Sequence, residues 1–272
     1  MMVDSHSHLN FKVFEKDLDN VLARCFDEDV RMVNVGTKYE TSKKAIEIAE
    51  RYDKGVYASV GLHPVHMVTD VMKIRTDEEE GAFSPKGEDY NADKYRDLCS
   101  SSKVIAIGEI GLDFYYKPKT KTRIEVYKNQ QTELLLKQMG LAEELGLPVI
   151  FHCRKAHELL IDILKKKNVQ GVIHCFTGTW QEAKKYLDMG FYIGINGIMY
   201  KLDLREVIEN TPIERILVET DCPYLTPPQA GAERNEPAFV KYIAKDIARI
   251  KNISFEEVSQ ITAQNAQNLF GI

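Results

Sequence analysis

Seven residues that could bind metal ions, namely five histidines, one glutamate and one aspartate, stand at the ends of short apolar runs in this sequence. In a parallel β/α barrel, the carboxyl ends of the strands face a common mouth, where active sites form. Side chains up to two hundred positions apart are therefore expected to meet there. They follow the first, third, fourth, fifth, sixth and eighth runs: His6, His8, His63, Glu109, His152, His174 and Asp221.

The pair His6 and His8 has the spacing of two side chains on one side of an extended chain. Their imidazoles could therefore bind one metal ion together. Glu109 follows Gly108 and precedes the turn at Gly111, so its carboxylate could project into the mouth. Because a carboxylate has two oxygens, Glu109 could bridge two cations.

The remaining candidate ligands suggest a second cation. We expect His152 and His174 to bind it, and Asp221 either to hold a metal or to act as a general base. Imidazole and carboxylate ligands suit Zn²⁺, Mn²⁺ or iron, and Mg²⁺ where carboxylates and water dominate. Asp4 and Glu219 are expected to support the ligands from behind, with Asp4 able to fix a histidine tautomer.

Three further residues are candidates for contacting an anionic substrate. His63 stands before Pro64 without a paired ligand, and Arg154 could grip an anionic oxygen with its guanidinium group. Arg234 lies after the eighth strand, where barrels often bind phosphate. We expect packing roles, with the cysteines pointing away from the mouth, for His66, His157, Cys153, Cys175 and Cys222.

The architecture follows from apolar runs that alternate with stretches of helical period. Strands are predicted at 2–3, 31–35, 56–61, 104–107, 149–151, 171–173, 191–195 and 215–218. Helices are predicted over about 14–26, 41–52, 124–145, 155–167, 237–250 and 254–270. This order predicts an α/β fold, a (β/α)8 TIM barrel forming a single domain over residues 1–272. Its acidic, Gly- and Pro-containing stretch at about 76–93 is interpreted as a solvated loop insertion.

Composition excludes several classes of protein. Of the 272 residues, 44% are hydrophobic and 28% charged, the mix of a globular domain rather than a disordered chain. The sequence contains no apolar stretch long enough to span a membrane and begins without a signal-peptide pattern. Five cysteines without a C-x-x-C pair favour reduced thiols, so we expect a cytoplasmic protein, with a monomer as the default. The net charge of −5 argues against bulk nucleic-acid binding.

Six motifs in order across the chain resemble the TatD family of metal-dependent deoxyribonucleases. They are DSHSHL at 4–9, GLHP at 61–64, GEIGLDFYY at 108–116, HCR at 152–154, HCFTG at 174–178 and ETDCPYLTP at 219–227. The resemblance implies a TIM-barrel metallohydrolase with two divalent metal ions, Mg²⁺, Mn²⁺ or Zn²⁺. It also implies DNA as the substrate, with cleavage of phosphodiester bonds, often from the 3′ end of single strands.

By position, the resemblance assigns roles to individual residues. It implies that Glu109 belongs to both metal sites and that Asp221 completes the cluster. His63 and Arg154 match positions associated with the substrate phosphate. The implied first site contains His6, His8 and Glu109, and the implied second site contains Glu109, His152 and His174.

We therefore expect a 3′–5′ exonuclease that acts on single-stranded DNA. In this hypothesis Asp221 accepts the proton of the attacking water, and Glu109 and His63 are the other catalytic residues of the same centre. The same ligands could instead open a small ester, lactone, amide or aminoacyl ester. Related barrel hydrolases of that kind carry a carbamylated lysine where this chain has Glu109. A third interpretation is a metal- or nucleic-acid-binding protein without catalysis. The stretch at 76–93 is longer than the usual family connection and leaves substrate access and substrate identity open.

Overall fold

The computed structural model describes residues 1–72, 78–81 and 87–272, and within these ranges eight strands alternate with nine α-helices. The strands are β1 Met2–Ser7, β2 Val30–Val35, β3 Val56–Val60, β4 Val104–Asp113, β5 Val149–Arg154, β6 Gly171–Ile173, β7 Tyr192–Ile195 and β8 Ile216–Val218. The α-helices are α1 Leu18–Asp27, α2 Tyr39–Ala49, α3 Ala92–Leu98, α4 Lys121–Leu145, α5 His157–Leu164, α6 Trp180–Asp188, α7 Arg205–Asn210, α8 Val240–Lys251 and α9 Phe255–Phe270.

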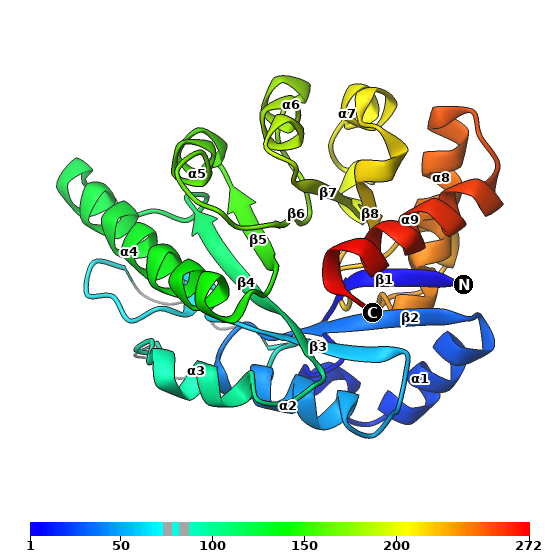
Figure 1. Ribbon diagram of the computed structural model, residues 1–272, viewed down its shortest axis with the longest axis horizontal. Coiled ribbons are helices and arrows are strands. Elements are labelled where there is room, and N and C mark those ends of the chain that lie inside the picture. Colours follow the sequence, from blue (N-terminus) through cyan, green and yellow to red (C-terminus); the bar gives the residue numbers. More distant parts are fainter. Residues whose placement is uncertain (73–77, 82–86) are drawn as a thin grey trace.

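The strands form one parallel sheet in the order β1 to β8, and the helices surround it as an outer ring (Figure 1). At the carboxyl ends, the backbone closes β8 onto β1. The amide of Asp221 donates to the carbonyl of His6 over 2.8 Å, and the amide of His8 donates to that of Cys222 over 2.9 Å. The predicted TIM barrel is confirmed, and its closing bonds lie between the candidate ligands of the first and last strands.

The buried faces of the elements explain this arrangement. All residues of β1 and β4 are buried, as expected for strands covered on both sides. Helix α9 lies beside β1, so the two chain ends are close (Figure 1). One apolar cluster joins seven strands to the C-terminal half of α9 and supports the sheet from that side. It includes Val3, Val33, Ile105, Ile150, Val172, Tyr192, Leu217, Ala266 and Phe270.

Strand β4 differs most from the prediction, because it continues six residues beyond the expected end at 107. It pairs with β5 through Ile110 and Phe151 and as far as Asp113 and Arg154. Gly111 permits this close pairing, since a Cβ atom there would lie 1.9 Å from the carbonyl oxygen of His152. Glu109 therefore belongs to a strand rather than to the following loop.

Smaller differences concern element ends. Helix α5 is shorter than the predicted 155–167, and residues 237–239 form a 3-10 turn before α8. Helices α3, α6 and α7 lie outside the predicted helical ranges. His6 and His152 lie inside their strands, not after them. Among the described helices, none has the length and apolar character that a membrane crossing needs.

The acidic stretch at 76–93 is only partly described, since 76–77 and 82–86 lie outside the described residues. Glu80 corrects the expectation of a solvated loop, because this residue is only 8% exposed. Its carboxylate accepts a hydrogen bond from Thr37 over 2.5 Å and lies 2.9 Å from His66 and 3.1 Å from Lys38. A buried carboxylate with these partners fastens the segment to the barrel.

Candidate metal centre at the mouth of the barrel

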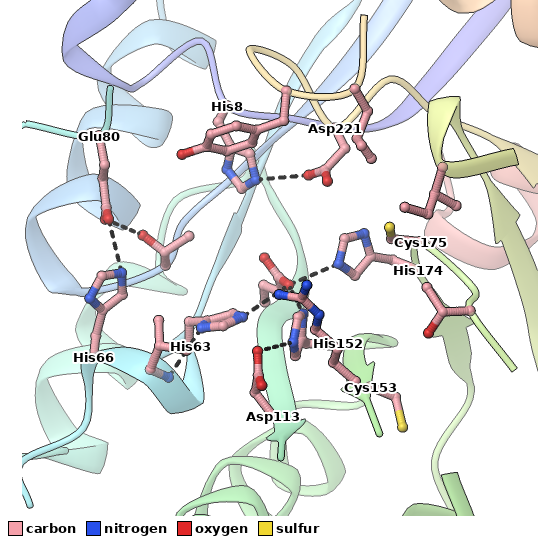
Figure 2. Close-up of a pocket in the computed structure, with 18 of the residues that line it drawn as sticks. His8, His63, His66, Glu80, Asp113, His152, Cys153, His174, Cys175 and Asp221 are labelled. Atoms are coloured by element: carbon pink, nitrogen blue, oxygen red, sulfur yellow. Dashed lines mark hydrogen bonds and ion pairs between the residues drawn. The ribbon is translucent and has the colours of Figure 1, made fainter. Parts of the chain in front are cut away.

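A cavity of about 550 Å³ opens at the carboxyl ends of the strands (Figure 2). The structure brings the predicted residues together there, although they come from six different strand ends. His6 lies fully buried beneath the others. The walls of the cavity include His8, His63, Glu109, His152, Arg154, His174 and Asp221.

His6, His8 and Asp221 form the first cluster. The Nε2 atoms of His6 and His8 are 3.1 Å apart, and Oδ1 of Asp221 lies 3.6 Å from the first and 3.4 Å from the second. Ligand atoms on a tetrahedral ion with bonds of 2.0–2.1 Å are about 3.3 Å apart. The three atoms therefore have the spacing that a single bound cation requires.

The tautomer of His8 supports this fit. Its Nδ1 lies 2.9 Å from the carbonyl oxygen of Val35, which can only accept, so Nδ1 carries the proton of the neutral ring. Nε2 then faces the carboxylate of Asp221, so either a proton, favoured by the raised pKa of His8 beside Asp221, or a metal cation lies between them. A backbone carbonyl behind an imidazole is a common support for metal-ligating histidines.

Glu109 divides its two oxygens between two groups of imidazoles. Oε2 lies 3.5 Å from Nε2 of His6. Oε1 lies 2.7 Å from Nδ1 of His152, 2.8 Å from Nε2 of His174 and 3.3 Å from Nε2 of His63. On this side, ligand atoms of His63, Glu109 and His152 lie within 4.8 Å of one another, so the carboxylate stands between two groups of possible metal ligands.

The electrostatics of the centre favour positive charge beside Glu109. Burial would raise the pKa of Glu109, but the surrounding histidines hold it well below its usual range. Burial would lower the pKa of His152, but hydrogen bonds with Asp113 and Glu109 raise it to about 9. At His63, burial outweighs the effect of the nearby Glu109 carboxylate and lowers the pKa to about 4. The carboxylates are therefore ionised and able to attract cations.

Asp113 supports the centre from behind and was not singled out from the sequence. Its Oδ2 lies 3.2 Å from Nε2 of His152 (Figure 2). Gln131 of α4 holds this residue by accepting from its backbone amide and donating to its carbonyl. The spacing of Asp113, four residues beyond Glu109 on the same extended strand, was the available signal.

Glu219 has the supporting position that was expected. Its Oε1 lies 3.4 Å from Nδ1 of His174, and its carboxylate accepts from the amide of Cys175 and from the side chain of Asn196. Asp4 corrects the expectation of a tautomer-fixing role. Its carboxylate accepts from the backbone amide of His6 and from Thr220, so it fixes the backbone rather than an imidazole ring.

Left-handed backbone turns follow several of the strand ends. Cys175 has φ 43° and Asp221 has φ 58°, a conformation that is uncommon for residues other than glycine. Such strained positions persist where the surrounding structure enforces them, often at functional sites. Cys153 and Cys175 both line the cavity, which corrects the expectation that all three cysteines lie away from it. The thiol of Cys153 also contacts the hydroxyl of Tyr186 over 3.9 Å.

Two arginines predicted to contact phosphate have different surroundings. Arg154 lines the cavity, with its guanidinium carbon 3.7 Å from the ring centre of Tyr115. Arg234 is engaged elsewhere, because it forms an ion pair of 2.6 Å with Asp17 and lies over Phe14. The expectation of a phosphate contact at Arg234 is therefore wrong, because the N–H groups of its guanidinium already bind the carboxylate of Asp17.

The other two histidines lie in different surroundings, one in the core and one in the cavity wall. His157 packs in the core, 3.1 Å from the hydroxyl of Tyr186, as expected. His66 lies in the cavity wall, where Glu80 holds its ring (Figure 2). Sequence reasoning missed Glu80 as a cavity residue, because its burial depends on contacts with distant parts of the chain.

A TIM barrel whose mouth gathers imidazoles and carboxylates around one buried glutamate is typical of metal-dependent hydrolases. Residues 3–271 match the family model described as TatD related DNase, and the chain belongs to this family. The uncharacterized metal-dependent hydrolase YabD of Bacillus subtilis is 38% identical over the full length of both chains. A 3′-5′ ssDNA/RNA exonuclease TatD from Erwinia tasmaniensis is 35% identical, again over the full length of both.

Solved structures agree with this assignment. The crystal structure of YJJV, a TatD homologue from Escherichia coli, superimposes with a TM-score of 0.81 and 26% identity, covering 100% of this chain and 98% of that one. A TatD family hydrolase from Entamoeba histolytica superimposes with a TM-score of 0.79, also at 26% identity, covering 99% and 97%.

Proposed function

We propose that this protein hydrolyses phosphodiester bonds at the 3′ end of single-stranded DNA and uses two divalent cations, Mg²⁺, Mn²⁺ or Zn²⁺. The division of the two Glu109 oxygens between opposite groups of imidazoles carries the proposal. Two-metal centres of this kind serve phosphodiester hydrolysis. Full-length relatives bearing the name 3′-5′ ssDNA/RNA exonuclease support the choice of substrate.

The residues present divide into two ligand sets around Glu109. His6, His8 and Asp221 would hold one cation with Oε2, and His152 and His174 the other with Oε1. Divalent cations bound there favour deprotonation of water and neutralise charge that develops on the phosphate oxygens.

Asp221 is the proposed general base. Its side chain is 15% exposed, which leaves the carboxylate accessible to a water molecule in the cavity. Its pKa lies below the usual range, since hydrogen bonding with His8 and the nearby imidazole charges outweigh burial. In this proposal Oδ2 accepts the proton of the water that attacks phosphorus.

His63 and Arg154 are the proposed phosphate contacts. The amide of Val65 donates to Nδ1 of His63 over 3.2 Å, so Nε2 of the neutral ring carries the proton. It lies in the cavity wall, 3.3 Å from Oε1 of Glu109. Arg154 adds a permanent positive charge in the wall of the same cavity. Together they would orient the phosphate with respect to Asp221.

The test is cleavage of a single-stranded DNA oligonucleotide carrying a 5′ label, in Mg²⁺ or Mn²⁺. Asp221→Asn removes the base, and Asp27→Asn changes an exposed aspartate at the far end of α1 as a matched control. We expect a ladder that shortens from the 3′ end for the wild type and the control. The ladder should be absent with a chelator and with Asp221→Asn.

Two results would overturn the proposal. Robust cleavage by metal-free protein would exclude the two-cation chemistry. No cleavage by metal-loaded wild type, together with turnover of a small ester, lactone or amide, would keep the centre and change the substrate class.

A further inference from the structure

The surface beside the cavity carries a concentration of positive charge that contrasts with the acidic chain. Residues 114–128 contain five lysines and arginines and one glutamate, for a net charge of +4. Arg154 and Lys155 raise this to +6, whereas the whole chain has −5. The remaining residues therefore carry −11, and a polyanion is attracted to this one region more than to the rest of the surface.

These residues meet because strands β4 and β5 end side by side. The amide of Phe114 donates to the carbonyl of Arg154 over 2.9 Å, immediately after their last paired residues. This bond brings the segment that follows β4 against the segment that follows β5. Lys155 has a left-handed backbone, with φ 59°, and its exposed side chain lines a second cavity.

This second cavity, of about 400 Å³, has walls of aromatic rings and lysines. Tyr115 lies in its wall and is 49% exposed. Lys117 and Lys155 are exposed, and the ammonium group of Lys128 lies 5.5 Å from the ring centre of Phe114. We call Tyr115, Lys117, Lys128 and Lys155 the basic shoulder. Exposed aromatic faces between cations are the usual components of a surface that binds single-stranded nucleic acid.

Arg154 connects the basic shoulder to the candidate metal centre. Its side chain lines the first cavity while its guanidinium stacks on Tyr115, which lines the second. Tyr116, whose ring centre lies 4.8 Å from that of Tyr115, also lines the first cavity. A strand with its terminal phosphodiester at Glu109 would thus meet Arg154 and then Tyr115.

We infer that the basic shoulder binds the part of a single-stranded polynucleotide next to the bond being cleaved, and this inference rests on the proposed function. Lys117, Lys128 and Lys155 contact backbone phosphates, and a base stacks on Tyr115. Stacking on an exposed ring requires an unstacked base, which a single strand supplies and a duplex does not. Because phosphates and ring faces are common to all nucleotides, the shoulder recognises no particular sequence.

The test compares two double variants with the same change in charge. Lys117→Gln with Lys155→Gln alters the shoulder. Lys54→Gln with Lys166→Gln alters two exposed lysines in the loops that enter β3 and β6 at the opposite end of the barrel. The kcat/KM is measured with a long single-stranded oligonucleotide and with a dinucleotide at several salt concentrations. Binding of a fluorescent oligonucleotide is measured in the Asp221→Asn background.

We expect the shoulder variant to bind the oligonucleotide more weakly and to flatten the slope of log affinity against log salt by about 1.4, since each phosphate contact on a single strand contributes about 0.7. Dinucleotide turnover and the control variant should match the wild type. Tyr115→Leu should weaken oligonucleotide binding about tenfold without changing the salt slope.

The outcomes separate this inference from the proposed function. Cleavage by the wild type with an unchanged salt slope in the shoulder variant would overturn the inference alone. Binding that depends on the shoulder, without cleavage by the wild type, would overturn the proposed function alone. No binding of the oligonucleotide to the Asp221→Asn protein would overturn the inference.

Discussion

The metal centre and the basic shoulder adjoin each other at the barrel mouth but are built differently. His6, His8, Glu109 and His174 are at most 4% exposed and are held by strands or the residues next to them. The shoulder stands on segments that follow β4 and β5, with Tyr115 about half exposed. Buried charged groups depend on one another strongly, whereas exposed charges act additively and are screened by salt. A single mutation in the centre should therefore remove nearly all activity, whereas each mutation in the shoulder should weaken nucleic-acid binding only in part.

The largest effect is expected for Glu109→Gln, because an amide presents one oxygen where the bridge uses two. Loss of several kcal/mol of transition-state stabilisation corresponds to a decrease of about 10³-fold or more in kcat. Single-turnover cleavage with excess enzyme measures this change, with the exposed Glu47→Gln of α2 as the control. A decrease below about tenfold would show that the chemistry does not depend on the bridge.

A smaller effect is expected for Asp113→Asn, which acts through His152. The carboxylate holds Nε2 of this ring over 3.2 Å, and loss of such a support costs about 10–100-fold in metal affinity or activity. Titration with Mn²⁺ should show weakened affinity and a kcat that recovers as Mn²⁺ is raised. An unchanged affinity with reduced kcat would instead place Asp113 at the substrate.

Glu80, in the wall of the first cavity, tests stability rather than catalysis. Burial raises its pKa, but His66, Lys38 and Thr37 lower it from 4.5 to about 2. Because the folded-state pKa is depressed, the carboxylate stabilises the protein above about pH 4.5, by about 3 kcal/mol, and this contribution is lost as the pH falls towards 2. The free energy of unfolding of Glu80→Gln should therefore lie below that of the wild type at pH 7, and this difference should be about 2 kcal/mol smaller at pH 3.

Urea unfolding at the two pH values measures that difference, and Glu78→Gln is the matched control because Glu78 is an exposed neighbour in the same segment. An equal deficit at both pH values would mean that Glu80 contributes through packing and not through its charge.

The smallest effect separates the two arginines. Arg154→Gln should lower kcat/KM on DNA about tenfold, the cost of one hydrogen bond to a charged group. Arg234→Gln should leave kcat/KM unchanged, because its guanidinium pairs with Asp17 away from the cavity. Equal losses in both variants would contradict the assignment of Arg154 to the substrate.

The convergence of the candidate ligands could be predicted because it depends on local pattern and on one topological rule. Apolar runs place the strands, and a parallel barrel brings their carboxyl ends together. The length of β4 could not be predicted in the same way. Gly108 and Gly111 weaken any strand signal, and pairing with β5 overrides this local preference.

Contacts between residues far apart in the sequence explain the other predictions that were wrong or missing. Arg234 meets Asp17 across 217 positions. Glu80 is held by Thr37 and Lys38, just before α2, and by His66 in the turn after β3. The basic shoulder was missed because its charges lie in two segments, 114–128 and 154–155, which only the pairing of β4 with β5 brings together. Charge counted along the chain gives the +4 of residues 114–128 but not its combination with Arg154 and Lys155.

Whether Glu109 bridges two cations can be measured most directly in a crystal structure of the protein soaked in Mn²⁺, with anomalous scattering to locate the metal. We expect two peaks on either side of the Glu109 carboxylate. One should lie beside His6, His8 and Asp221 and the other beside His152 and His174, about 3.5–4 Å apart. A single peak, or two peaks that Glu109 does not contact, would contradict this expectation.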